Sequence, residues 1–422
     1  MTAGVGRARR RRRPTVGLFG QLGSGNVGND ASMRTVVDHL RSRHPTVDLR
    51  VMTTGNHEVA DRYRVRASPL HVVDALPSRP HGAVGMLVRL WGKAADVVAT
   101  VVWLVGLDVV IVPGMGVLEA SVPMWAWQFP FALFTMCLAA RLLGVQVALV
   151  GVGAQAVTQL PLRFLLVRSA RTARYRSYRD ELSRTAMHDM GVDTSSDPVF
   201  CDMVFALPVP VGVMPTPGCV GLGVMDYHGR NAATDRRRDA EIHASYLMML
   251  SRFALRLIDS GRSLRLFVGD RVDVEVAEHL LHELRAARPG LADDRAVLVA
   301  ADDFDALMTA MAQVEIVVAT RYHNVVAALK VGKPTLSLGY APKNAAMMES
   351  FGQGRFALAL AGVDFEQLCD RFDELDADRS AAARAIEESS ARYRTRAEEQ
   401  LADLSRLLER RTGSSPRPGV PA

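Results

Sequence analysis

Residues 314–338 read VEIVVATRYHNVVAALKVGKPTLSL, and this stretch predicts the class of fold. The apolar, mostly β-branched run Val314–Ala319 predicts a buried strand, and Asn324–Val331 has the spacing of a helix. A second buried strand is predicted at Thr335–Leu338. Strands joined by one helix are typical of a parallel sheet, and the turn from strand to helix then lies at the carboxyl edge, where ligands bind.

That turn carries Arg321 and His323, and Lys343 and Asn344 follow the next strand. Arg321 is suited to binding a phosphate or carboxylate with its two-pronged fork, beside the amides of a helix start. His323 titrates close enough to neutrality to act as a general acid or base next to that anion. The structural alternative is that Arg321 pairs with a core acid and His323 caps the helix.

The same alternation of strands and helices begins at Val16 and predicts two doubly wound, Rossmann-like α/β domains. Four prolines between Leu207 and Gly218 indicate an extended linker between them. Facing domains closed by C-terminal helices describe a GT-B-like arrangement with a ligand cleft between the lobes. The strands expected in the first domain are Val16–Phe19, Asp48–Met52, Asp108–Val112, Gln146–Val150, Ala173–Ser177 and Val199–Cys201. The expected segments are a disordered basic arm (1–14), the N-terminal domain (15–206), the linker (207–218), the C-terminal domain (219–362), C-terminal helices (363–411) and a disordered tail (412–422).

Composition narrows the class of protein. A chain of 422 residues, 49% hydrophobic and 23% charged, is long enough for about two or three globular domains. The net charge of +6 equals the contribution of Arg7 and Arg9–Arg13, so the remainder is neutral and has no nucleic-acid signature. We expect the arginine arm to be solvated, with a tether to anionic lipid as the alternative. Four scattered cysteines suggest neither disulfides nor structural zinc and fit a reducing cytoplasm.

Two apolar stretches are too short or too interrupted to span a membrane. Val97–Leu107 lies between two aspartates, and Val122–Ala140 contains Gln128 and Pro130. Both are expected to be buried helices. An alternative for Val97–Leu107 is that it rests on a membrane surface.

Glycine turns follow three predicted strands of the first domain and allow backbone amides to approach a ligand closely. Because the strands are parallel, the turns would line one edge and form a shelf that suits a sugar or lipid-linked sugar. Close packing of strand on helix is the alternative. The first turn also fits the dinucleotide pattern, but no acid closes the second strand, so nicotinamide binding is disfavoured. The turns contain Gly23, Gly25 and Gly28, then Gly114 and Gly116, then Gly151 and Gly153.

Taken in order from about Val16 to Phe356, the motifs of the chain resemble the polysaccharide pyruvyl transferase family. One departure is Asn29-Asp30, where the family usually has Asp-Glu, so this chain lacks one carboxylate there. The motifs that carry the resemblance are Gly25-Asn26-x-Gly28, Gly114-x-Gly116, Gly151-x-Gly153-x-Gln155, Tyr178-Arg179-Asp180, Arg321-Tyr-His323 and Tyr340-Ala-Pro-Lys343-Asn344.

The resemblance implies transfer of the enolpyruvyl unit of phosphoenolpyruvate to a sugar diol of a cell-envelope or exopolysaccharide glycan, forming a pyruvate ketal without cofactor or metal. Asp180 or Asp202 would be the base, although structural pairing is the favoured interpretation for Asp180. His228 is a second candidate for phosphate, because it follows the first strand of the C-terminal domain. The expected catalytic residues are His323 and Arg321. The expected phosphoenolpyruvate ligands, mainly from the C-terminal domain, are Arg321, Lys343, Arg179, Asn344 and His228. The expected acceptor-binding residues, all in the N-terminal domain, are Gly25, Asn26, Gly28, Gly114, Gly116, Gly153 and Gln155.

Two other functions stay open. A nucleotide-sugar glycosyltransferase would share the architecture but needs an acid for the ribose, and Ala319–Lys330 has none. A catalytically silent glycan-binding protein is suggested only by Asn29.

His279 and His282 lie one helical turn apart without a third metal ligand, so they are expected to face solvent. The expected location is the cytoplasm. Peripheral contact with the inner face of the plasma membrane is a further possibility.

Overall fold

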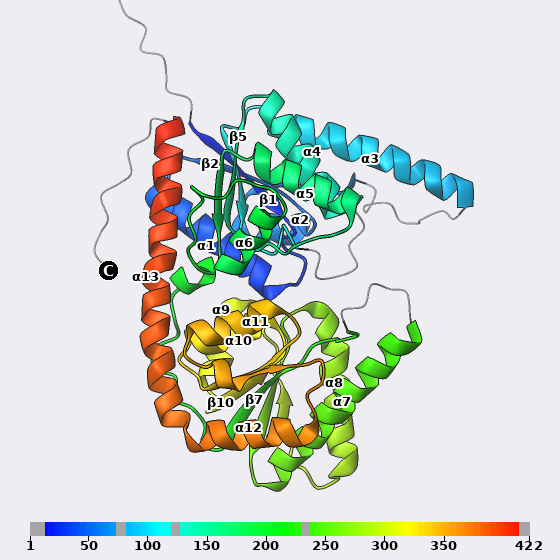
Figure 1. The fold of residues 1–422 in the computed structure, drawn as a ribbon, viewed down its shortest axis with the longest axis vertical. Coiled ribbons are helices and arrows are strands. Elements are labelled where there is room, and N and C mark those ends of the chain that lie inside the picture. Colours follow the sequence, from blue (N-terminus) through cyan, green and yellow to red (C-terminus); the bar gives the residue numbers. More distant parts are fainter. Residues whose placement is uncertain (1–12, 73–81, 120–126, 230–235, 413–422) are drawn as a thin grey trace, which may run out of the picture.

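The chain forms two α/β lobes, each built around a six-stranded sheet (Figure 1). This architecture comes from a computed structural model that describes residues 13–72, 82–119, 127–229 and 236–412. The predicted pair of doubly wound domains is confirmed. The expected basic arm up to residue 12 and the tail beyond residue 412 lie outside the described residues.

The sheet of the N-terminal lobe is parallel and has the strand order β3-β2-β1-β4-β5-β6. Strand β3 was not predicted, because its sequence Arg-Ala-Ser-Pro lacks an apolar run. The strand expected at Val199–Cys201 is wrong: Val199 forms only an isolated bridge with Tyr178. The strands are β1 (Thr15–Gly20), β2 (Asp48–Thr53), β3 (Arg66–Pro69), β4 (Val109–Pro113), β5 (Gln146–Val152) and β6 (Tyr175–Tyr178).

The sheet of the C-terminal lobe is also parallel, with the order β12-β11-β10-β7-β8-β9. In both sheets the strand order reverses beside the first strand of the lobe, at β1/β4 and β7/β10. Crevices at such switch points are the usual ligand sites of open α/β sheets. The strands are β7 (Cys219–Gly223), β8 (Ser263–Phe267), β9 (Ala296–Leu298), β10 (Ile316–Ala319), β11 (Thr335–Gly339) and β12 (Ala357–Ala359).

Helices cover both faces of each sheet, and short 3-10 turns complete the loops. The N-terminal lobe has α1 (Val27–Arg43), α2 (Asn56–Tyr63), α3 (Gly82–Leu104), α4 (Phe129–Leu142), α5 (Leu160–Thr172), α6 (Glu181–Asp189) and η2 (Met203–Ala206). The C-terminal lobe has α7 (Arg236–Asp259), η3 (Arg271–Asp273), α8 (Val274–Ala287), α9 (Phe304–Ala312), α10 (Tyr322–Lys330), α11 (Pro342–Ser350), η4 (Gly354–Phe356) and α12 (Phe365–Ala377).

The last helix, α13 (Arg379–Thr412), runs along both lobes (Figure 1). Its early residue Ile386 lies in the hydrophobic core of the C-terminal lobe, whereas Leu404 and Leu408 lie in that of the N-terminal lobe. Burial of these side chains in separate cores fixes the two lobes to one continuous helix.

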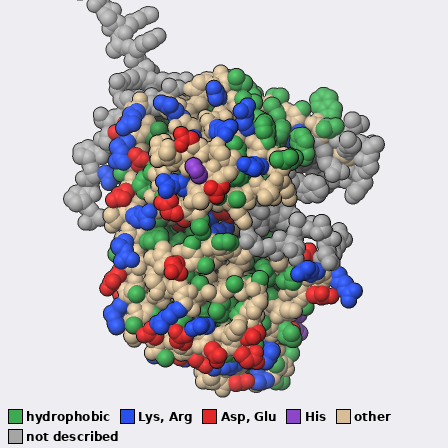
Figure 2. Space-filling view, in the orientation of Figure 1, with side chains coloured by type: hydrophobic (Ala, Val, Ile, Leu, Met, Phe, Trp, Pro, Cys, Tyr) green, Lys and Arg blue, Asp and Glu red, His purple; other side chains and the backbone are tan. Residues whose placement is uncertain are grey.

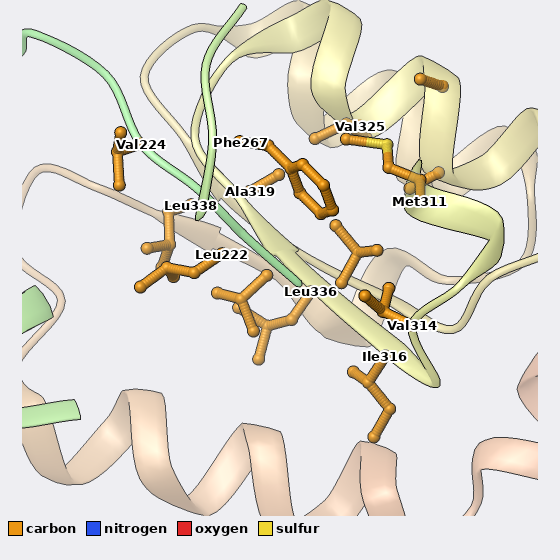
Figure 3. Close-up of a cluster of buried hydrophobic side chains, with 14 of the residues drawn as sticks. Leu222, Val224, Phe267, Met311, Val314, Ile316, Ala319, Val325, Leu336 and Leu338 are labelled. Atoms are coloured by element: carbon orange, nitrogen blue, oxygen red, sulfur yellow. The ribbon is translucent and has the colours of Figure 1, made fainter. Parts of the chain in front are cut away.

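The stretch that predicted the fold forms the centre of the C-terminal core. Figure 3 shows Ile316 of β10, Leu222 of β7 and Leu336 of β11 gathered in one apolar cluster, and all three side chains are fully buried. β10 pairs with β7 on one side and β11 on the other, so it is an interior strand of the sheet. Its residues Ile316–Ala319 are all buried, because helices pack on both faces of a parallel sheet, and this requires a continuous apolar sequence.

Helix α3 departs from the expectation of a buried helix at Val97–Leu107. Trp103 and Leu104 are buried, but Val98 and Val102 are 62% and 66% exposed. The helix is therefore amphipathic. Within the described residues, no helix combines the length and apolarity needed to cross a membrane.

Candidate functional site

The candidate residues gather where the carboxyl edges of the two sheets face each other. The C-terminal lobe supplies them from the start of α10 and from α11, as the sequence pattern predicts. The N-terminal lobe supplies them from the loops after β4 and β6 and from the segment before η2.

Arg321 is the N-cap residue of α10 and forms a two-point ion pair with Asp273. Its Nε donates to Oδ2 at 2.8 Å and its Nη2 to Oδ1 at 2.6 Å. Asp273 is fully buried and also accepts the backbone amides of Asp226 and Asp270, at 2.9 and 3.1 Å. Arg321 therefore pairs with a buried acid, as the structural alternative from the sequence proposed. The ion pair fixes its guanidinium group, and Nη1 is the one guanidinium nitrogen that does not bond to Asp273.

His323 lies between the lobes, against Asp202 and the first glycine loop. Its Nε2 is 3.7 Å from Oδ2 of Asp202, which is 4% exposed. Burial alone would raise the pKa of Asp202, but the imidazole of His323 holds it below its usual value. Asp202 is therefore a carboxylate that can orient the imidazole of His323.

Gly28 makes room for this imidazole. A Cβ at Gly28 would lie 2.0 Å from the ring of His323, so any other residue would displace it. The adjacent residues of the same loop also dock on the C-terminal lobe. Asn26 donates to Oδ2 of Asp270 at 2.9 Å, and the amide of Val27 donates to the carbonyl of Gly269 at 3.2 Å.

Glu119, a residue that sequence analysis missed, lies at the centre of the cluster. Its Oε2 accepts a hydrogen bond from Lys343 Nζ at 2.8 Å, and its Oε1 accepts one from Arg179 Nη2. Glu119 is 6% exposed; burial opposes its ionisation, yet the two cations hold the pKa of its carboxyl below the usual range. Since Lys343 belongs to α11 and Glu119 to the other lobe, this ion pair joins the lobes.

Two of the predicted glycine turns provide space for this ion pair. A Cβ at Gly116 would lie 2.7 Å from the Glu119 carboxylate, and one at Gly153 would lie 2.5 Å from Arg179 Nη2. Gly25 and Gly114 have φ values of 87° and 56°, which favour glycine. The sequence feature that could have pointed to Glu119 is its position, three residues after the Pro-Gly-x-Gly turn.

Arg179 and Lys343 approach one aromatic ring from opposite lobes. The guanidinium carbon of Arg179 is 4.8 Å from the ring centroid of Tyr322, and Lys343 Nζ is 5.4 Å from it. Arg179 also lies 3.5 Å from Asp180, whose side chain accepts the amide of Ser183 and caps α6. The expected structural pairing of Asp180 is thus present. The interlobe cluster thus consists of two cations (Arg179 and Lys343), the imidazole of His323 and two carboxylates (Glu119 and Asp202), all largely buried.

The remaining expected residues lie around this cluster. Asn344 is fully buried and donates to the carbonyl of Thr320 at 3.4 Å, so it holds α11 to the edge of the sheet. The amide of Gln155 donates to the carbonyl of Leu118 at 3.1 Å. His228 is paired with Asp226 on the loop after β7. The contacts described for it do not include Glu119 or Lys343. The substrate roles of these residues stay predictions.

At Asn29-Asp30 the sequence departs from the pattern of the resembling family, and there the side chain of Asp30 bonds to its own loop. Its Oδ1 accepts the amide of Gly23 at 2.5 Å, and Asn29 donates to the carbonyl of Gln21 at 3.3 Å. Burial raises the pKa of Asp30 to about 6. Both side chains therefore form hydrogen bonds within the glycine loop.

Solved structures share this architecture. Staphylococcus aureus MnaA, in a co-structure with UDP, superposes with a TM-score of 0.60 at 12% identity over 94% of this chain and 97% of that chain. The UDP-GlcNAc 2-epimerase of Neisseria meningitidis, bound to UDP-GlcNAc, gives 0.58 at 10% identity over 93% and 100%. Anabaena HepE, in complex with UDP and glucose, gives 0.56 at 14% identity over 94% and 100%. No curated protein matches the sequence.

Two facing parallel-sheet lobes give the chain the GT-B-like architecture of these solved structures. A narrower assignment comes from the sequence, because the family model for polysaccharide pyruvyl transferase matches residues 26–342. The chain belongs to the polysaccharide pyruvyl transferase family and is a transferase.

Proposed function

We propose that the protein transfers the enolpyruvyl unit of phosphoenolpyruvate to two hydroxyls of a cell-envelope or exopolysaccharide sugar. The observation that carries this proposal is the convergence of Lys343, Arg179 and the His323–Asp202 pair between the lobes. Phosphoenolpyruvate has a phosphate and a carboxylate, so two cations beside a proton donor match its charges.

The reaction requires one proton at C3 of phosphoenolpyruvate, which makes C2 electrophilic. His323 in its imidazolium form supplies this proton, and Asp202 stabilises the charged ring. Two sugar hydroxyls then form bonds to C2, and the bond from C2 to the phosphate oxygen breaks. Of the two protons that the hydroxyls lose, one replaces the proton taken by C3 and the other leaves on inorganic phosphate.

Glu119 neutralises the two cations before the substrate binds. Because Lys343 is 17% exposed and Arg179 only 3%, Lys343 is the cation that can more readily exchange Glu119 for the substrate phosphate. Arg321 is committed to Asp273, so we assign it to the support of this site, with Nη1 left to contact the substrate carboxylate.

Release of inorganic phosphate from phosphoenolpyruvate, with free and polyprenyl-linked glycans as acceptors, tests the transfer. We expect His323→Gln to lower the rate by about 10²–10⁴-fold, as for loss of a general acid, while phosphoenolpyruvate still binds. His279→Gln on α8, 53% exposed, is the control and should have the rate of the parent. Full activity in His323→Gln would refute its role. Turnover of UDP-sugars without phosphoenolpyruvate would favour the glycosyltransferase, and glycan binding without any turnover would favour the silent protein.

We also propose that the protein works in the cytoplasm, with α3, α4 and α5 touching the anionic inner face of the plasma membrane. Figure 2 shows hydrophobic side chains gathered over α3 and α4 on the N-terminal lobe. This apolar face comprises Leu90, Trp91, Val98, Val102 and Val105 of α3 and the loop after it, with Leu138, Leu142, Leu160 and Phe164 of α4 and α5, all more than a third exposed.

The charges around the apolar face favour lipid over a second protein. Helices α4 and α5 contain four arginines and no acid, and Arg168 lies 5.6 Å from the ring of Phe164. In α3 the one acid, Asp96, is buried and paired with Lys93 and His71. An apolar surface edged by arginines matches anionic headgroups over acyl chains.

Sedimentation with vesicles of phosphatidylglycerol and phosphatidylcholine tests this contact. We expect the protein to bind the anionic vesicles, and Val98→Glu/Val102→Glu to lose that binding, because both side chains face outward. Met248→Glu on α7, 60% exposed, is the matched control in the other lobe. Equal binding by the α3 variant and its parent would refute the contact without bearing on phosphate release.

A further inference from the structure

Three potential metal ligands lie together outside the interlobe cluster. Asp226 and His228 belong to the loop after β7, and His243 belongs to α7. In the portion of the chain that the structure describes, they are a group whose ligand atoms lie within 4.8 Å of one another.

The ligand atoms of this group lie close to the spacing of a coordination shell: the distance from His243 matches it, and the distance from His228 is that of a hydrogen bond. His228 Nε2 lies 2.8 Å and His243 Nδ1 3.5 Å from the same Oδ1 of Asp226. In a tetrahedral zinc site, bonds of about 2.0–2.2 Å separate neighbouring ligand atoms by about 3.3–3.5 Å. The two imidazoles are stacked, with centroids 4.4 Å apart and planes 9° from parallel, so small rotations of the rings would direct both nitrogens to one ion.

One nitrogen of the group faces more acceptors than it has protons. His243 Nδ1 is also 3.2 Å from the carbonyl oxygen of Tyr227, so a single N–H is shared between that oxygen and the Asp226 carboxylate. A cation in place of this proton would interact with both oxygens at once. The side chains of Asp226, His228 and His243 are 35%, 49% and 24% exposed, which leaves a route for an ion from solvent.

We propose that Asp226, His228 and His243 bind one divalent transition-metal ion of the zinc type, with water or the Tyr227 carbonyl completing its coordination. Two imidazoles with one carboxylate select zinc, cobalt or nickel over magnesium, which prefers oxygen ligands. The site is separate from the proposed transfer chemistry, and its presence does not depend on that proposal.

Such an ion would act on the neighbouring edge of the sheet. The amide of Asp226 donates to Oδ1 of Asp273 at 2.9 Å, and Asp273 holds Arg321. A metal that ties α7 to this loop would therefore also fix the acid that positions Arg321.

Titration of the tag-free full chain with Co²⁺ and Zn²⁺ after dialysis against a chelator tests the site. We expect one ion per chain and a visible Co²⁺ spectrum of low coordination number, with Mg²⁺ bound far more weakly. Asp226→Asn and His243→Gln should each weaken binding at least about tenfold. His279→Gln, which alters a histidine beside Glu283 on α8, should bind like the parent.

The proposal is overturned if neither ion binds stoichiometrically, if both ligand variants bind as tightly as the parent, or if His279→Gln removes the binding. Circular dichroism of the metal-free variants establishes that they are folded. His228→Asn serves in place of either variant that is not, because His228 is the most exposed of the three.

Discussion

Replacing Glu119 by Gln should destabilise the protein far more than an ordinary change of charge. Glu119 neutralises Arg179, whose side chain is 3% exposed, and Lys343, whose side chain is 17% exposed. Removing one partner of a buried ion pair costs about 3–5 kcal/mol, because the other charge is left without compensation. Most of this loss arises at Arg179, since Lys343 can regain contact with water, and the loss should fall near the lower end of this range because Asp180 remains 3.5 Å from Arg179.

Urea unfolding followed by circular dichroism measures the effect. The control Glu241→Gln removes the partner of Arg237, in a pair whose side chains are 91% and 64% exposed. Exposed pairs contribute about 0–1 kcal/mol, so this variant should unfold almost like the parent. Equal losses in the two variants would show that Glu119 does not compensate a buried charge.

The same variant connects stability with the proposed function. Phosphoenolpyruvate should raise the unfolding midpoint of Glu119→Gln more than that of the parent, because the substrate anion replaces the lost carboxylate beside Lys343 and Arg179. An equal shift in both proteins would mean that Glu119 does not compete with substrate.

Three further predictions concern other parts of the fold. Gly28→Ala should lower phosphate release by at least about tenfold with little loss of stability, because its Cβ would meet the ring of His323 at 2.0 Å; unchanged kinetics would contradict this packing. The pKa of Asp30 is raised from 3.8 to about 6, so its favourable contribution is present below pH 3.8 and lost as the pH rises through 6. Asp30→Asn should therefore gain up to about 3 kcal/mol at neutral pH and nothing below pH 3.8, and a loss at neutral pH in denaturant titration would refute the assignment. Leu404→Ala should cost about 2–5 kcal/mol in the same titration, because Leu404 is fully buried in the N-terminal core, and a change below about 1 kcal/mol would show that α13 does not stabilise that lobe.

Sequence patterns located most strands and many helices because buried parallel strands require continuous apolar runs. Ile316–Ala319 and Val109–Val112 are of this kind, and both lie in strands where the sequence predicts them. The edge strand β3 has no apolar run, and the edge strand β12 is only three residues long, so neither stands out in the sequence. The exposed face of α3 was missed because high apolarity alone does not tell which side of a helix is buried.

The candidate site was predicted in part. His323 and Lys343 stand at the strand ends where a parallel sheet gathers ligands, and the structure brings both to the interlobe cluster. Arg321 is held by Asp273, 48 residues earlier, and no local pattern could reveal that pairing. Glu119 was overlooked because a single acid after a glycine turn has no distinctive spacing.

By itself, the sequence determined the periodicity of the elements, the two parallel sheets and the edge at which their reactive side chains lie, because these follow from local spacing and chain direction. The charges that meet across the lobes, Lys343 with Glu119 and His323 with Asp202, became known only from the three-dimensional arrangement of the chain. The physical reason is distance along the chain. Ion pairs and close packing between residues more than a hundred positions apart depend on how the two lobes are held together, here by α13 and the interlobe contacts.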